Sequence, residues 1–135
     1  MIKELQVQVP GQGLHEITAQ VSTAVRESEI EDGLCTVFLR HTSASLTIQE
    51  NADPSARRDL EGWLRRLVPE DDPHFTHTAE GPDDMPSHIK AALTSTSLGI
   101  PVVGGSLALG TWQGIYLWEH RSGANSRRLV VHINT

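Results

Sequence analysis

The sequence predicts an α+β fold whose sheet is mainly antiparallel. Segments in which apolar and polar residues alternate, the period of a half-buried strand, open the chain and dominate residues 97–133. Segments whose apolar residues recur every three or four positions, the period of an amphipathic helix, lie between them. At 135 residues the chain suits a single domain covering residues 1–135.

The first elements are predicted to be a hairpin followed by a helix. Residues 2–9 alternate, and the turn sequence P-G-Q-G at 10–13 leads into residues 14–18, which together indicate an antiparallel hairpin. The apolar spacing then becomes helical. Thr18 suits the N-cap of a short amphipathic helix that ends near Glu29.

Two more strands are expected before the chain returns to helix. Residues 34–39 form an uninterrupted apolar run, which is typical of a strand covered on both faces. Cys35 is the only cysteine and lies inside this run, so we expect a buried side chain and no disulfide within the chain. Residues 43–48 alternate and indicate the second strand.

A longer helix should begin at Pro54, with Asp53 as its N-cap, and should end at Pro69. The acidic segment 70–86 lacks periodicity and is expected to be a long loop, a type of segment that is more often functional than idle. A short helix should follow over residues 86–93. The remaining strands are predicted at residues 98–103, 106–109, 114–118 and 128–133.

The composition narrows the classes of partner. Lys and Arg number 11 against 17 Asp and Glu, the formal net charge is -6, and no basic run offers a surface for duplex nucleic acid. No segment approaches the roughly 20 consecutive apolar residues of a membrane span, and the start of the chain alternates where a signal peptide has an apolar block. We expect a cytoplasmic protein with neither nucleic acid nor membrane as partner.

Two polar segments carry the candidate functional residues. Residues 40–53 place His41, Glu50 and Asn51 between an apolar strand and a helix, where a scaffold rarely needs so many polar groups. Residues 74–88 add further histidines and carboxylates. If the fold brings the two segments together, they predict a metal or catalytic site.

The histidines suggest the metal. A neutral imidazole is the commonest side-chain metal ligand, and three of them with one open position form a usual catalytic zinc site. His41, His77 and His88 are the candidates. They lie on separate segments without a close H-E-x-x-H pair, so spacing leaves a second interpretation open, in which they only satisfy hydrogen bonds beneath a loop.

Carboxylates near these histidines could serve as general acids or bases. Glu50 lies three residues before Asp53, while Glu80, Asp83 and Asp84 crowd the long loop. The alternative is structural, because acidic residues at a helix start are favoured by the helix dipole and acidic loops are usually solvated.

A third group lies near the carboxyl end of the chain. In G-T-W-Q-G at 110–114, Gln113 offers a neutral donor and acceptor that could orient a ligand, although a tight hairpin with the tryptophan packed over it explains the motif equally well. Arg121, Arg127 and Arg128 frame the final turn. Their guanidinium groups suit phosphate or carboxylate recognition, or they form an ordinary solvated rim.

Three long motifs together resemble the YjbQ family of small proteins. They are R-H-T-S-A-S-L-T-I-Q-E-N-A-D-P at 40–54, H-T-A-E-G-P-D-D-M-P-S-H-I-K at 77–90 and G-T-W-Q-G-I-Y-L-W-E-H-R at 110–121. The resemblance covers nearly the whole chain. It implies a compact antiparallel β-sandwich of the α+β class, with two or three short helices, that assembles as a homotrimer.

The resemblance also implies a site and an activity. Family members are associated with a secondary thiamine-phosphate-synthase activity, which couples a pyrimidine diphosphate to a thiazole phosphate. A bound divalent metal is implied, and histidine ligands favour zinc over magnesium. The histidine positions map to His41, His77 and His88, with Glu50 and Asn51 beside the first and Asp84 beside the last.

Three functions therefore remain open at this level: a metal-binding transferase that acts on a small phosphorylated substrate, a metal-dependent hydrolase, and a non-catalytic ligand-binding trimer. For an enzyme, the expected catalytic residues are Glu50, Asn51, Asp84 and Gln113. Glu50 is expected to act as general base or to orient a metal ligand, because the chain could return it to the same end of the sheet as His41. Gln113 would orient the substrate.

Overall fold

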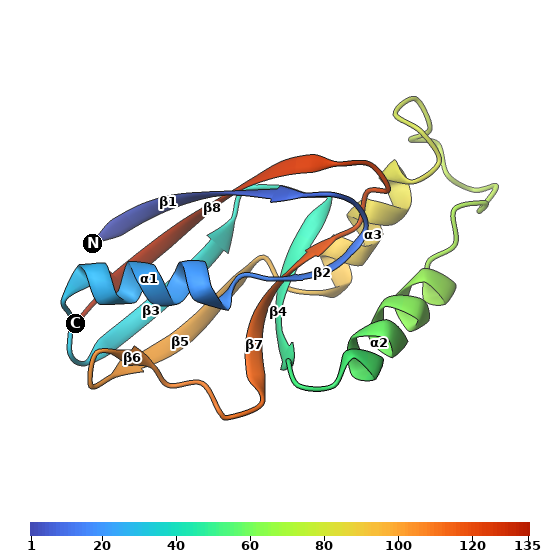
Figure 1. Cartoon of the computed structure of the whole chain (residues 1–135). Coiled ribbons are helices and arrows are strands. Elements are labelled where there is room, and N and C mark those ends of the chain that lie inside the picture. Colours follow the sequence, from blue (N-terminus) through green and yellow to red (C-terminus); the bar gives the residue numbers. More distant parts are fainter.

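A computed structural model describes residues 1–135, and its strands form two antiparallel sheets (Figure 1). The first sheet has the strand order β1 (Ile2–Val9), β8 (Asn125–Asn134), β3 (Gly33–Leu39), β5 (Ser97–Val103) and β6 (Ser106–Leu107). The second has the order β2 (Gly13–Glu16), β7 (Gln113–Glu119) and β4 (Ala44–Glu50). Three helices complete the chain: α1 (Thr18–Ser28), α2 (Pro54–Leu67) and α3 (Asp84–Leu93).

The main core lies between the two sheets and α1. Val37 of β3, Leu117 of β7 and Val21 of α1 are fully buried members of one apolar cluster to which both sheets contribute. This arrangement confirms the predicted α+β class with an antiparallel β-sandwich. None of the three helices combines the length and the apolar character that a membrane crossing needs.

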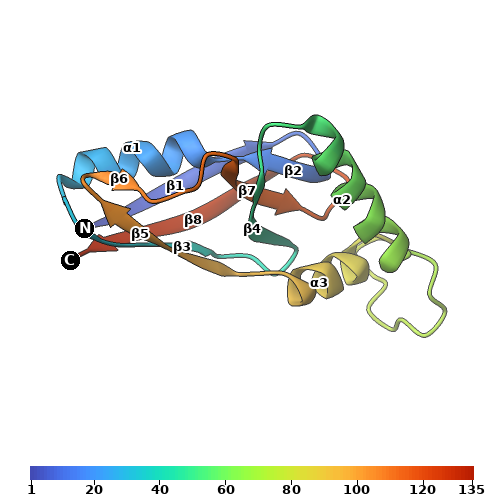
Figure 2. The same cartoon turned by 90° about the horizontal axis from the view of Figure 1, so that it is seen from below.

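A smaller apolar cluster attaches the other two helices to the three-stranded sheet. Leu64 and Val68, at the carboxyl end of α2, pack with Tyr116 and Trp118 of β7 and with Leu14 of β2. Figure 2 shows α2 and α3 together at one end of the molecule, with both chain termini and α1 at the other. The segment that joins α2 to α3 carries His74 and His77, and it lies at the same end of the molecule as these two helices.

Two expectations about the strands were wrong. Residues 2–9 and 14–16 do not form a hairpin, because β1 pairs with β8 while β2 pairs with β7 in the other sheet. Alternation defines a strand but does not choose its partner. Nor is β3 covered on both faces: Cys35 is buried, whereas Leu34 and Phe38 are 45% and 47% exposed.

These exposed side chains belong to one uncovered surface, which we call the outer face. It consists of the side chains of the five-stranded sheet that point away from the core, and its apolar members are Ile2, Leu34, Phe38, Val103 and Val130. The three helices pack elsewhere, α1 against the inner side of this sheet and α2 and α3 against the second sheet. The outer face is thus open in a single chain.

The helix boundaries agree with most of the sequence-based expectations. Asp53 is the N-cap of α2, where its Oδ1 accepts a hydrogen bond from the Ser55 amide at 2.9 Å, and Pro54 is the first helical residue. Thr18, however, is the first residue of α1 and not its cap. Its hydroxyl instead accepts from the Ile115 amide at 2.8 Å, which ties α1 to β7.

The segment after α2 contains no helix or strand from residue 68 to residue 83, as the absence of periodicity predicted. Helix α3 then begins at Asp84, two residues before the expected start. The earlier start matters for the site, because it places Asp84 inside the helix and one turn before His88.

Candidate metal centre

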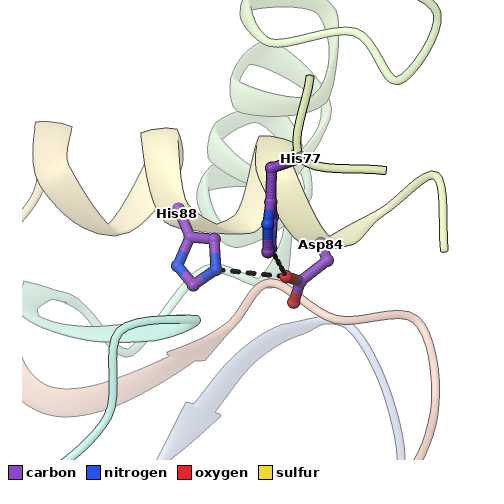
Figure 3. Close-up of side chains that lie close together, drawn as sticks. All are labelled: His77, Asp84 and His88. Carbon is purple, nitrogen blue, oxygen red and sulfur yellow. Dashed lines mark hydrogen bonds and ion pairs between the residues drawn. The ribbon is translucent and has the colours of Figure 1, made fainter. Parts of the chain in front are cut away.

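Three side chains from the second polar motif converge on one point (Figure 3). His77 approaches from the loop, while Asp84 and His88 project from successive turns of α3. One carboxylate oxygen, Asp84 Oδ2, lies 2.6 Å from His77 Nε2 and 3.1 Å from His88 Nε2. The three possible ligand atoms all lie within 4.8 Å of one another, and they form a group that could hold a metal ion.

Asp84 is buried and held as a carboxylate. Its second oxygen, Oδ1, accepts a hydrogen bond of 2.7 Å from Arg121 Nη1, and the residue is 3% exposed. Burial raises the pKa of Asp84, but the hydrogen bond from His77 and the charge of Arg121 outweigh that effect and hold the pKa below its usual value. One oxygen is thus fixed by an arginine and the other faces two imidazoles.

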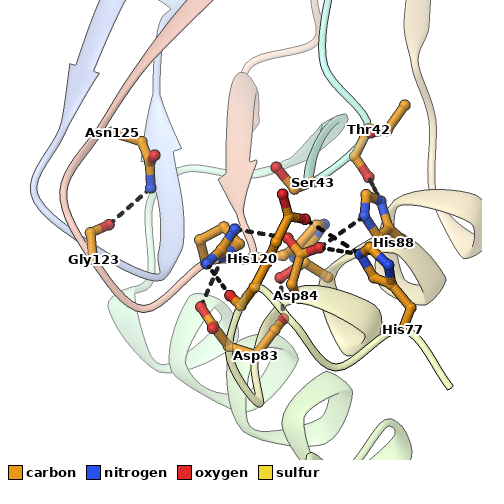
Figure 4. A network of polar contacts seen from close by, with 12 residues as sticks. Thr42, Ser43, His77, Asp83, Asp84, His88, His120, Gly123 and Asn125 are labelled. Atoms are coloured by element: carbon orange, nitrogen blue, oxygen red, sulfur yellow. Dashed lines mark hydrogen bonds and ion pairs between the residues drawn. The ribbon is translucent and has the colours of Figure 1, made fainter. Parts of the chain in front are cut away.

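Arg121 is itself anchored by Asp83, the acidic residue before Asp84. Figure 4 shows Asp83 and Asp84 in one network of polar contacts. Arg121 Nε donates to Asp83 Oδ2 at 2.9 Å, and Nη2 donates to the Glu80 carbonyl at 3.0 Å. Asp83 also accepts from the amide of Ser122 at 3.0 Å. This chain of contacts fixes Asp84 relative to the turn after β7, as supporting contacts do around metal ligands.

His88 presents a defined nitrogen to the centre. Its Nδ1 lies 2.9 Å from the carbonyl oxygen of Thr42, which can only accept, so Nδ1 carries a hydrogen. In a neutral ring, Nε2 then carries no hydrogen and can only accept. The atom that it faces, Asp84 Oδ2, can also only accept. Two acceptors at this separation require a cation between them, either a proton or a metal ion.

The separations also suit a metal ion. Ligand atoms about 2.0–2.2 Å from a tetrahedral zinc lie about 3.3–3.6 Å from one another. The 3.1 Å between Asp84 Oδ2 and His88 Nε2 is close to that range, and the 2.6 Å to His77 Nε2 is shorter, as expected for a direct hydrogen bond. Two imidazoles and one carboxylate would leave a coordination position for water or substrate.

His41, the third expected metal ligand, lies outside this group. Its Nε2 accepts a hydrogen bond of 2.8 Å from the Arg128 amide, and its Nδ1 lies 3.4 Å from Arg127 Nη1. Burial, followed by the charge of Arg127, holds the pKa of His41 below its usual value. The next residue, Thr42, provides the carbonyl that accepts from His88, so His41 adjoins the centre without facing it.

Glu50, Asn51 and Gln113 also lie away from the three converging side chains. The expectation that Glu50 returns to the His41 end of the sheet was wrong, because β4 continues to Glu50, where it pairs with Gln113. Six residues of strand separate Glu50 from Ala44, a length of roughly 20 Å.

The side chains at this far end have partners of their own. Gln113 Oε1 accepts from the Gly110 amide at 2.8 Å and closes a turn. The turn is not the expected hairpin, because β6 and β7 belong to different sheets, and Trp112 is 63% exposed instead of packed over it. Asn51 Nδ2 donates to Glu16 Oε2 at 3.4 Å. Within one chain these residues therefore form a separate polar group.

A buried ion pair connects the centre to His41, and sequence reasoning did not find it. Glu119 is completely buried at the end of β7 and accepts from Arg127 Nε at 2.6 Å, from Arg127 Nη2 and from the Arg121 amide. Two of the three arginines considered for phosphate or carboxylate recognition, Arg121 and Arg127, thus bind carboxylates of their own chain. A charged residue that ends the apolar run of β7 was the available sign of this pair.

His120 and Lys90 form a second buried polar group. His120 is 1% exposed, and its Nε2 lies 2.9 Å from Ser45 Oγ. Burial lowers the pKa of His120 to about 3, with the charges of Lys90 and Arg127 adding to the effect. Burial also lowers the pKa of Lys90. The cavity beside them is about 10 Å³, enough for one water molecule and too small for a substrate.

A larger hollow lies on the other side of α3. A surface groove of about 250 Å³ is lined by His41, Thr42, His88, Ala91, Ala92 and Thr96. The groove brings His41 and His88 to one surface, so residues of both polar motifs do meet, with Thr42 between them. A small molecule in this groove would contact the ring of one ligand of the candidate centre.

The comparisons with known proteins cover the whole site. A family model described as "UPF0047 protein YjbQ-like" matches residues 3–135. The chain is 51% identical over 130 residues to UPF0047 protein sll1880 of Synechocystis sp., covering 96% of this chain and 88% of that protein. It is 43% identical over 129 residues to UPF0047 protein YjbQ of Escherichia coli O157:H7, covering 95% and 93%.

Solved structures share the fold. A crystal structure of an uncharacterised conserved protein of the YjbQ/UPF0047 family from Clostridium acetobutylicum matches with a TM-score of 0.90 and 38% identity, covering 98% of this chain and 99% of that chain. A conserved hypothetical protein from Thermus thermophilus matches with a TM-score of 0.88 and 34% identity over the same shares.

Proposed function

The chain belongs to the UPF0047 YjbQ-like family, and from that premise we propose that it is a metal-dependent enzyme that acts on a small phosphorylated substrate. The observation that carries the proposal is the acceptor pair of His88 Nε2 and Asp84 Oδ2, with His77 completing the group. These side chains are of the types that bind zinc, and the adjoining groove gives a substrate access.

In this proposal His77, Asp84 and His88 bind the metal, and zinc is the metal that two imidazoles and a carboxylate favour. A bound divalent ion supplies positive charge that stabilises an anionic leaving group and lowers the pKa of a bound water. Arg121 keeps Asp84 ionised and oriented, and the Thr42 carbonyl keeps His88 Nε2 turned toward the centre. His41 lines the groove and contacts the substrate there.

The reaction proposed first is the coupling of a pyrimidine diphosphate to a thiazole phosphate, as in secondary thiamine-phosphate synthases, which the sequence motifs resemble. A metal centre beside an open groove supports it, because loss of a diphosphate group requires charge stabilisation. Hydrolysis of a small phosphorylated compound is the second candidate. It is favoured by the ligand set, since two histidines and a carboxylate with an open position are typical of hydrolytic zinc sites.

We also propose that the protein assembles as a homotrimer. The outer face supports this assembly, because a sheet surface with Leu34, Phe38 and Val103 exposed is usually covered by another chain. Closed symmetry is the common way to cover such a surface. Assembly could also bring Glu50, Asn51 and Gln113 of one copy toward the groove of another.

Metal analysis of the untagged protein tests the site. We expect one zinc ion per chain in the wild type, and a loss of zinc affinity of more than about 100-fold in His77→Ala and His88→Ala, because changes outside the ligand set already cost roughly 10–100-fold. His74→Ala is the matched control, since His74 lies on the same loop but outside the group. Unchanged zinc affinity in His88→Ala would refute the centre.

The zinc-loaded protein should then be assayed for coupling of the two thiamine precursors and, separately, for release of inorganic phosphate from a panel of small phosphate esters. Turnover that His88→Ala abolishes and His74→Ala preserves supports an enzyme, and the assay in which it occurs selects between the two reactions. Zinc binding without any turnover would favour a non-catalytic ligand-binding protein.

A further inference from the structure

Two hydrogen-bond donors converge beside the groove at His41. The Arg128 amide donates to His41 Nε2 at 2.8 Å, and because an amide N–H cannot accept, a neutral His41 ring carries its hydrogen on Nδ1. The neighbour of Nδ1, at 3.4 Å, is Nη1 of Arg127, which is also a donor. An oxygen atom that accepts from both groups would complete the contact, and an anionic oxygen would do so most favourably.

The charges around this point are unusual for the chain. The formal net charge is -6, yet Arg127, Arg128 and Arg40 all lie close enough to His41 to lower its pKa, after the larger effect of burial and against the opposing charge of Glu119. Only Arg127 has a buried partner, the carboxylate of Glu119. The area around His41 is therefore locally positive on an acidic protein.

The other two arginines are available to a ligand. Arg40 makes an exposed contact of 3.9 Å with Glu4, and such pairs contribute little to stability. The side chain of Arg128 is exposed on β8. Both guanidinium groups could therefore turn toward an anion at modest cost, and their planar donors suit the oxygens of a phosphate.

The positive area is continuous with the candidate metal centre. The groove that contains His88 shares His41, Thr42 and Thr96 with a neighbouring hollow of about 440 Å³, which Arg40 also lines. A ligand could thus extend from His88 along Thr42 to Arg40. Small side chains on α3 leave its path open.

We infer that the His41 end of the groove is a subsite for a phosphate group, held by His41 Nδ1, by Arg127 Nη1 beside it and by the guanidinium group of Arg40, with Arg128 reaching in from the adjacent hollow that it shares with Arg40. The inference deepens the proposed function, on which it rests for the identity of the groove as the substrate site. It predicts a substrate with two ends. One end reacts at the metal-binding residues, and the other carries a phosphate that anchors the substrate and does not react.

Inorganic phosphate is the probe, titrated into zinc-treated protein at constant ionic strength and followed by the NMR signals of the backbone amides. We expect saturable shifts centred on the Arg128 and Thr42 amides. The affinity should fall about tenfold for each of Arg40→Gln and Arg128→Gln, as expected for the loss of a charge-assisted hydrogen bond. The double variant should show no binding up to roughly 10 mM phosphate.

Arg66→Gln is the matched control, because it removes the same charge from the exposed surface of α2 and should leave phosphate affinity unchanged. His77→Ala separates the two proposals. It should lose zinc and retain the phosphate shifts at Arg128, whereas Arg128→Gln should retain zinc and lose phosphate. Wild-type affinity in the Arg40→Gln, Arg128→Gln double variant, shifts centred elsewhere, or no phosphate binding by the wild type would overturn the subsite.

Discussion

At the scale of single residues, Asp84 shows how one buried carboxylate can organise a site. Its two oxygens have different tasks, since Oδ1 pairs with Arg121 and Oδ2 faces the imidazoles of His77 and His88. The sequence motif placed Asp84 beside the last histidine, and the expected role of Asp84 was catalytic. The geometry makes it a proposed metal ligand, because α3 begins at Asp84 and a carboxylate at that position faces the residue one turn later.

His120 should make the stability of the protein depend on pH. Its pKa is about 3 in the folded chain and about 6.5 when unfolded, so below pH 6.5 the unfolded chain takes up a proton that the folded chain does not. Stability must therefore fall as the pH falls through this window. We expect the free energy of unfolding to be about 2 kcal/mol lower at pH 5 than at pH 7.5, measured by urea denaturation with a chelator present.

The variant His120→Gln isolates this effect, because glutamine can still hydrogen-bond to Ser45 but cannot be protonated. It should be less stable at pH 7.5 yet lose less stability between pH 7.5 and pH 5. His74→Gln changes an exposed histidine on the loop between α2 and α3, so it serves as the control and should keep the wild-type slope. If both variants keep that slope, His120 is not the group that causes it.

At the scale of elements, α2 depends on its first turn. Leu64 is its only fully buried residue, so the helix is attached by few contacts and local stabilisation counts for more. Asp53→Ala removes the acceptor of the Ser55 amide, and we expect the Tm to fall by roughly 3 °C. Asp59→Ala, the same change at an exposed position inside α2, should not lower the Tm, because alanine favours helix there.

The same helix shows what sequence could predict. The start of α2 was predicted correctly because its determinants, Asp53 and Pro54, are adjacent in the chain. The partner of β1 was not, because β8 lies more than a hundred residues away and alternation is equally compatible with many partners.

The candidate site shows the same difference between features set by nearby residues and features set by distant ones. His77, Asp84 and His88 lie within one short motif and do converge, whereas the return of Glu50 to His41 depended on where β4 ends. The Glu119 and Arg127 pair was missed because burial of a charge depends on the partner that another strand supplies.

At the scale of the whole molecule, the outer face predicts the effect of a charge placed on it. Phe38→Glu puts a carboxylate at the centre of this surface, and if the face is the trimer contact, light scattering should show a mass of one chain where the wild type shows three. Trp63→Glu removes a similarly exposed aromatic side chain from α2 and should remain trimeric. A monomeric wild type at micromolar concentration would refute the assembly.

The position of β8 in the five-stranded sheet has a consequence for synthesis in the cell. This strand pairs with β1 on one side and β3 on the other, so β1 is not joined to the rest of the sheet until residue 134 has been added. At roughly 5–20 residues per second, the 95 residues between Leu39 and Asn134 take the ribosome about 5–20 s. During that interval β1 has no partner strand and β3 can pair only with β5, which is when a chaperone or a neighbouring nascent chain would compete for their free edges.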